Sequence, residues 1–123
     1  MYSISQEEVV MHKRILCPER LRRIPPHFNW IDHRLVSERH IDELSHQACA
    51  LYLFLVTAAD RYGLSYYGER TLQRRLSMDC SLLSDSFDEL VRADLVCRDT
   101  PLCQVLSLEE DDSCTPVYKE YLP

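Results

Sequence analysis

The apolar residues between positions 41 and 62 recur at alternating intervals of three and four, which places them on one face of a helix. This face consists of Ile41, Leu44, Ala48, Leu51, Leu55, Ala58 and Tyr62. Much of the opposite side is also apolar, with Cys49, Tyr52, Leu53 and Val56, as is typical of a central, buried helix. Asp42 or Ser45 is predicted to cap its start through a side-chain oxygen, and Gly63 is predicted to close it.

The pattern changes after Gly63 and predicts a strand followed by two shorter helices. Leu64–Tyr67 is β-prone, and Glu69–Leu76 returns to helical spacing, with Leu72 and Leu76 one turn apart. Residues 77–79 are predicted to form a tight turn, because Asp79 is a good N-cap for a helix from Cys80 to about Ala93. The buried stripe expected on this last helix is Leu83, Phe87, Leu90 and Val91.

The chain then predicts a β-hairpin, with strands at residues 95–98 and 102–108 and a turn at residues 99–101. A short helix that is joined by a three- or four-residue turn to a second helix is a helix-turn-helix, and a trailing hairpin makes it winged. The predicted fold class is therefore mainly α with a small β-hairpin, arranged as a winged helix-turn-helix.

The N-terminal part gives weaker signals. Glu7–Leu16 is predicted to form a short helix, and Pro25 and Pro26 favour an extended chain. Residues 28–31 are expected to be extended and to lead into a short strand, or an arm across the core, at residues 32–36. Phe28 and Trp30 are expected to pack in the core rather than on a partner, because large aromatic side chains are usually buried.

Length and composition support one globular domain. The chain has 123 residues, of which 46% are apolar and 28% charged, and this size can bury a core without metals or disulfides. There is no apolar run of 18 residues, and the acidic start is unlike a secretory signal, so a cytoplasmic protein without membrane contact is expected.

The net charge of −6 is unevenly distributed. Residues 1–39 hold seven basic and five acidic residues, residues 40–98 hold six and nine, and residues 99–123 hold one and six. We therefore divide the chain into an N-terminal arm (1–39), a winged helix-turn-helix domain (40–108) and a flexible acidic tail (109–123).

Neither the cysteines nor the histidines have the spacing of a metal site. The six cysteines include no CxxC pair, and His33, His40 and His46 fit no single helical face. Free thiols are expected, with Cys97 and Cys103 facing each other across the hairpin. No cofactor and no catalytic activity are expected either, since only two glycines occur and no set of nucleophile, base and orienting group is present.

The stretch from Gly63 to Val96, GLSYYGERTLQRRLSMDCSLLSDSFDELVRADLV, resembles the winged helix-turn-helix proteins of bacteria and their mobile elements. These include replication initiators and DnaD-like N-terminal domains. The flanks, IPPHFNWIDHRLV (residues 24–36) and PLCQVLSL (residues 101–108), are similar to small helix-turn-helix proteins encoded near insertion-sequence transposases. The resemblance covers about residues 20–108 and implies a DNA-binding regulator of transcription, replication or transposition.

The resemblance also implies which residues contact double-stranded DNA. The helix starting at Cys80 would enter the major groove, with Ser81, Ser84 and Asp85 on its reading surface. Arginines on the preceding helix and on the hairpin would pair with phosphates, which positions a protein without reading sequence. These arginines are Arg70, Arg74, Arg75 and Arg98.

One feature departs from this pattern, because the predicted reading helix and its end hold Asp85, Asp88, Glu89 and Asp94 against Arg92. Phosphates repel such acids, and affinity for DNA depends largely on neutralising phosphates. The alternative is a winged-helix module that binds protein rather than DNA. A homodimer formed through the N-terminal arm or the central helix is compatible with DNA binding, since many such readers bind two half-sites.

Overall fold

The computed structural model describes residues 12–108. Within them, four α-helices and a three-stranded antiparallel sheet follow a short 3-10 turn, η1 (Pro18–Arg20). The helices are α2 (Arg34–Ser37), α3 (His46–Ala58), α4 (Glu69–Leu76) and α5 (Cys80–Arg92), and the strands are β1 (Leu64–Tyr66), β2 (Val96–Asp99) and β3 (Leu102–Val105). From residue 46 onward this confirms the predicted order of helix, strand, helix, turn, helix and hairpin.

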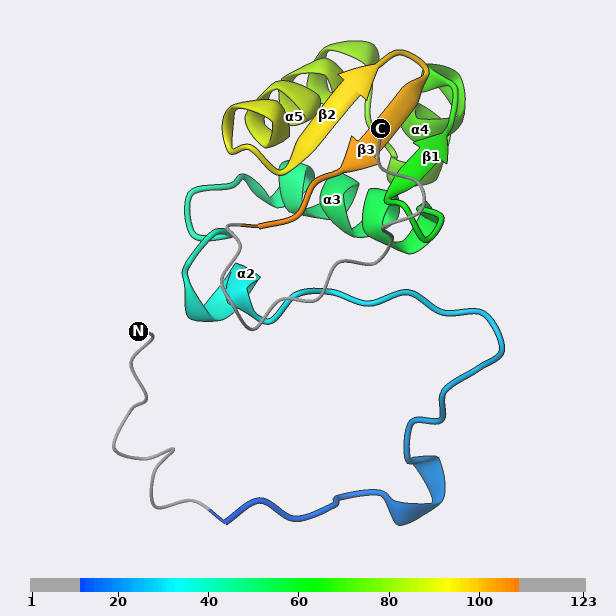
Figure 1. The fold of residues 1–123 in the computed structure, drawn as a ribbon, viewed down its shortest axis with the longest axis vertical. Helices are drawn as coiled ribbons and strands as arrows, with labels where there is room; N and C mark the ends of the chain where they lie inside the picture. Colours follow the sequence, from blue (N-terminus) through cyan, green and yellow to red (C-terminus); the bar gives the residue numbers. More distant parts are fainter. Residues whose placement is uncertain (1–11, 109–123) are drawn as a thin grey trace.

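The sheet is larger than the predicted hairpin, because β1 joins it. The strand order is β1-β3-β2, with Ser65 opposite Cys103 and Arg98 also opposite Cys103 on the other edge. Gly63, with a φ of 84°, directly precedes β1. Because it has no side chain, it can lie beside the carbonyl oxygen of Val105 in β3. Figure 1 shows the sheet on one side of α3, with α5 alongside β2.

The core lies where α3, α5 and the sheet meet. Helix α3 packs mainly on α5 and also contacts β3. Its contribution to the core is Ala48, Leu51, Tyr52, Leu55 and Val56, while α5 contributes Leu83, Phe87 and Leu90. Leu35 of α2 and Leu108 are buried in the same cluster, so the packed unit begins before residue 40.

Helix α3 is shorter than the periodicity suggested. Ser45 is its N-cap, and its hydroxyl accepts the backbone N–H of Ala48 at 3.1 Å, so Asp42 is not the cap. The helix ends at Ala58, and Gly63 belongs to the turn before β1 rather than to the helix terminus. Ile41 and Leu53 are exposed, because they lie outside the helix and on its outer face respectively.

The prediction for α5 is correct in its bounds and wrong in one core residue. Asp79 caps the helix by accepting the N–H of Leu82 at 2.7 Å. Val91, which was expected in the core, is 46% exposed. Ser86 is buried there instead, at 0% exposure. The buried hydroxyl of Ser86 is satisfied because it donates to the carbonyl oxygen of Leu82 at 2.7 Å.

The N-terminal predictions are mostly wrong. Residues 12–16 are not helical, and the rest of the predicted helix at 7–16 lies outside the described residues. Residues 34–37 form α2 instead of a strand. Before it, the chain turns at Asp32, whose carboxylate accepts the N–H of Arg34 at 2.9 Å and whose carbonyl oxygen accepts the N–H of Leu35 at 3.1 Å. Phe28 and Trp30 are exposed at 66% and 63%, not buried in the core.

The hairpin register also separates the two cysteines expected to face each other. Cys97 pairs with Gln104 and is exposed, whereas Cys103 pairs with Arg98 and is buried. Since side chains alternate between the faces of a strand, the two thiols point to opposite sides of the sheet. The predicted acidic tail, 109–123, lies outside the described residues.

Candidate nucleic-acid interface

The turn between α4 and α5 fixes the relative position of the two helices. Ser77 adopts a left-handed conformation at φ 54°, and the N–H of Met78 donates to the carbonyl oxygen of Gln73 at 3.0 Å. The side chain of Met78 is buried and lies 3.9 Å from the hydroxyl of Ser86 in α5. The turn between α4 and α5 is therefore anchored in the core, and the outer faces of both helices remain available for a ligand.

The predicted reading residues lie on the outer side of α5. Ser81, Ser84 and Asp85 are all exposed, and the buried stripe of the same helix faces α3 and the sheet. Ser81 and Ser84 lie in the first turns, where a reading helix meets base edges. The structure thus makes these three side chains accessible to a ligand that approaches α5 from outside.

The predicted phosphate-binding arginines fall into two groups. Arg70 and Arg74 are one helical turn apart on α4, and both are exposed. Arg75 is exposed too, but its guanidinium lies over the ring of Phe54 at 5.6 Å. Of the four arginines, Arg70 and Arg74 are therefore the exposed pair that makes no hydrogen bond, ion pair or ring contact with residues 12–108.

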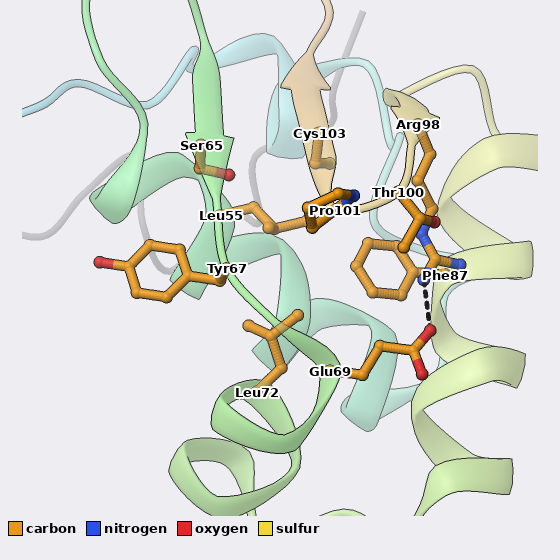
Figure 2. A pocket seen from close by; sticks show the side chains of 10 residues that line it. All are labelled: Leu55, Ser65, Tyr67, Glu69, Leu72, Phe87, Arg98, Thr100, Pro101 and Cys103. Carbon is orange, nitrogen blue, oxygen red and sulfur yellow. Dashed lines mark hydrogen bonds and ion pairs between the residues drawn. The ribbon is translucent and has the colours of Figure 1, made fainter.

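Arg98 lies in a different environment from the other three arginines. Its guanidinium is stacked over the ring of Phe87 at 3.8 Å and donates to Glu69 at 3.1 Å (Figure 2). The side chain is 23% exposed and links β2 to the first residue of α4 and to the middle of α5. These contacts position the hairpin, and they occupy the donor that was predicted to pair with a phosphate.

The cavity beside Arg98 is too small for a ligand. Leu55, Tyr67, Leu72 and Cys103 are among its walls (Figure 2). Its volume is about 10 Å³, and a site of that size holds at most roughly one water molecule. It is a packing gap between the sheet and helices α3, α4 and α5.

A larger groove runs between the C-terminal half of α5 and the loop that precedes α3. Its volume is about 500 Å³, and we call it the α5 groove. Its charged lining is Glu43, Asp85, Asp88, Glu89, Arg92 and His40. Asp85 therefore belongs both to the predicted reading surface and to a groove in which carboxylates outnumber cations, and this side of α5 repels phosphate.

Glu89 has a structural role that the sequence analysis did not detect. Its carboxylate accepts the backbone N–H of Ser45 at 2.8 Å and the hydroxyl of Ser45 at 2.6 Å. The two hydrogen bonds from Ser45, side chain first, lower the pKa of Glu89 below its usual 4.5. Glu89 thereby neutralises the N-terminus of α3, where the helix dipole favours negative charge. No local sequence pattern could have indicated this contact, because Glu89 and Ser45 are 44 residues apart.

Asn29 plays the corresponding role at the other end of α3. Its side-chain amide donates to the carbonyl oxygens of Val56 at 2.7 Å and Ala59 at 2.9 Å. The last carbonyls of a helix have no partner within the helix, so a side-chain donor there stabilises the terminus. Asn29 also fixes the end of the N-terminal arm against the folded unit.

The described cysteines are free thiols, namely Cys17, Cys49, Cys80, Cys97 and Cys103. Burial raises the pKa of Cys103 and of Cys49, which favours the inert thiol form. Residues 12–108 contain no group of three His, Cys, Asp or Glu side chains that could hold a metal ion. Nor does that part of the chain include a helix with the length and apolar character needed to cross a membrane.

Comparisons with protein-family models, with curated proteins and with solved structures found no match to this chain.

Proposed function

We propose that this protein is a winged helix-turn-helix protein that binds double-stranded DNA through the first turns of α5 and through α4. The arrangement that carries the proposal is the pair α4 and α5, joined at Ser77–Asp79 and followed by the β2–β3 hairpin on a sheet that includes β1. In that arrangement the second helix enters the major groove, and the first crosses the backbone.

The exposed side chains support this orientation. Ser81 and Ser84 in the first turns of α5 are neutral donors and acceptors that tolerate close contact with base edges. Arg70 and Arg74 on α4 are exposed one turn apart, where the helix would pass the phosphates. We leave Arg98 out of the interface, because Phe87 and Glu69 already hold its guanidinium.

The arginine pair provides the test of this proposal. Binding of purified protein to genomic fragments should fall steeply with salt, since each phosphate that a cation neutralises releases counterions. Replacing Arg70 and Arg74 with Ala should weaken binding to every sequence and reduce the slope of log K against log salt by about 2. Arg61→Ala, at an exposed position between α3 and β1, is the matched control and should leave the slope unchanged. Equal slopes for wild type and the double variant would contradict the proposal.

A second candidate function is supported by the α5 groove. Four carboxylates line it, against Arg92 and His40, and such a surface fits a basic protein segment better than a nucleic acid. Under this alternative the winged-helix arrangement serves as a scaffold for a protein interface. Wild-type protein that fails to bind any fragment at low salt would favour this alternative over DNA binding.

A further inference from the structure

Within the N-terminal arm (1–39), residues 12–31 form a basic and apolar segment, which we call the basic arm and which is hydrogen-bonded to the folded unit through Asn29. It carries Lys13, Arg14, Arg20, Arg22 and Arg23 against the single acid Glu19. Large apolar side chains alternate with these charges and are exposed, with Leu16 at 83%, Ile24 at 81% and Trp30 at 63%. Figure 1 shows the blue part of this stretch running clear of helices α3–α5 and the sheet. A segment with so much exposed apolar surface is typical of an interaction site.

Asn29 anchors the basic arm between two exposed aromatic residues. Its side chain is directed inward and donates to the carbonyl oxygens of Val56 and Ala59. The residues on either side of it, Phe28 and Trp30, are exposed and not packed in the core. The arm is therefore fixed at one end and displays two exposed rings there, and such rings commonly dominate the energy of an interface.

The same chain carries a surface of complementary charge. The α5 groove, of about 500 Å³, exposes Glu43, Asp85 and Asp88, and Leu44 and Ala93 add apolar patches. Glu89 is already held by Ser45, so the other three carboxylates are the ones available to a partner. The groove is mainly acidic and the arm mainly basic, so their charges are complementary. Both surfaces combine charged with apolar side chains.

We propose that a second copy of this chain occupies the α5 groove, with the basic arm of each protomer lying in the groove of the other. Such an exchange is isologous, since both copies use the same two surfaces and the assembly closes as a two-fold dimer. The inference does not depend on DNA binding. In the dimer the arm neutralises Asp85 and Asp88, which removes a source of repulsion from α5.

A second copy fits the observations better than DNA does as the partner of the arm. DNA would pair with Arg20, Arg22 and Arg23, but it would leave the apolar side chains between them in water. It would also leave the groove with its excess of carboxylates over cations. Reciprocal exchange covers the apolar side chains and pairs both sets of charges in one interface.

Charge reversal tests the pairing. One variant reverses the arm (Arg20→Glu, Arg22→Glu, Arg23→Glu), and the other reverses the groove (Glu43→Lys, Asp85→Lys, Asp88→Lys). All six side chains are exposed, so circular dichroism should show both variants folded. Native mass spectrometry and sedimentation of the nuclease-treated full chain then give the dimer dissociation constant at low salt.

We expect wild type to dimerise and each reversed variant to dimerise more weakly by about tenfold or more. Mixing the two variants should restore a 1:1 heterodimer, because each acidic arm then meets a basic groove and each basic arm an acidic groove. Phe28→Ser with Trp30→Ser should weaken the dimer without affecting the fold. A matched control, Arg61→Glu, should leave the dissociation constant unchanged.

Three results would overturn the inference. The first is wild-type protein that stays monomeric up to the highest soluble concentration. The second is a dimer that neither reversal weakens, which would mean that other surfaces form it. The third is a mixture that fails to form the heterodimer, which would show that the arm and groove do not contact each other. If wild type is monomeric and the arm variant loses affinity for DNA, DNA is the partner of the arm.

Discussion

At the scale of single residues, side chains from distant parts of the chain hold the two ends of α3. Glu89 accepts two hydrogen bonds from Ser45 at the helix start, and Asn29 donates two to the carbonyls at its end. Both side chains come from distant parts of the chain. The bounds of α3 therefore coincide with these hydrogen bonds and not with the limits of its apolar pattern. The acid that seemed to oppose DNA binding therefore has a structural function.

Replacing Glu89 with Gln should lower the free energy of unfolding at pH 7 by about 1–2 kcal/mol, because a charged acceptor at a helix start is lost. The pKa of Glu89 is lowered in the folded state, so its contribution is present above the usual 4.5 and is lost as pH falls through the folded value. Urea denaturation should thus show a gap between wild type and variant at pH 7 that narrows as the pH falls below 4.5. Asp88→Asn is the control, and a gap of constant size as the pH falls below 4.5 would contradict this role.

At the scale of elements, the bounds of α4 and α5 were predictable, because their signals are local. Asp79 stands directly before an apolar stripe with helical spacing, and Leu72 and Leu76 mark one face of the preceding helix. The start of α3, the strand register and the exposure of Phe28 were not predictable. Each depends on a contact between distant segments, namely Glu89 with Ser45, β1 with β3, and Asn29 with Val56.

The glycines on either side of β1, Gly63 and Gly68, permit a test of how closely this strand packs on β3. Gly63 has φ 84°, and a Cβ there would lie 2.6 Å from the carbonyl oxygen of Val105. Gly63→Ala should therefore cost about 2 kcal/mol or more, since both the backbone conformation and the close approach are lost. Gly68 has no atom within 4 Å of such a Cβ, and Gly68→Ala should cost less than about 1 kcal/mol. Thermal unfolding measures both, and equal losses would contradict the close packing of β1 on β3.

At the scale of the whole molecule, the candidate site is only partly what the sequence suggested. The outer faces of α4 and α5 present Arg70, Arg74, Ser81 and Ser84 as expected, because helical periodicity determines which residues face outward. The environment of Arg98 could not be predicted, since it depends on how β2 lies across α5. The α5 groove could not be predicted either, because Glu43 and Asp88 come from elements that meet only in the folded chain.

The most direct test of the proposed function is selection of double-stranded DNA from a random library by the purified full chain at low salt. We predict enrichment of a defined sequence whose binding weakens as salt rises and whose base preference changes when Ser81 and Ser84 are replaced with Ala, while Asp88→Asn leaves that preference unchanged. A library that stays unenriched, with wild-type protein folded throughout, would contradict DNA binding by this fold.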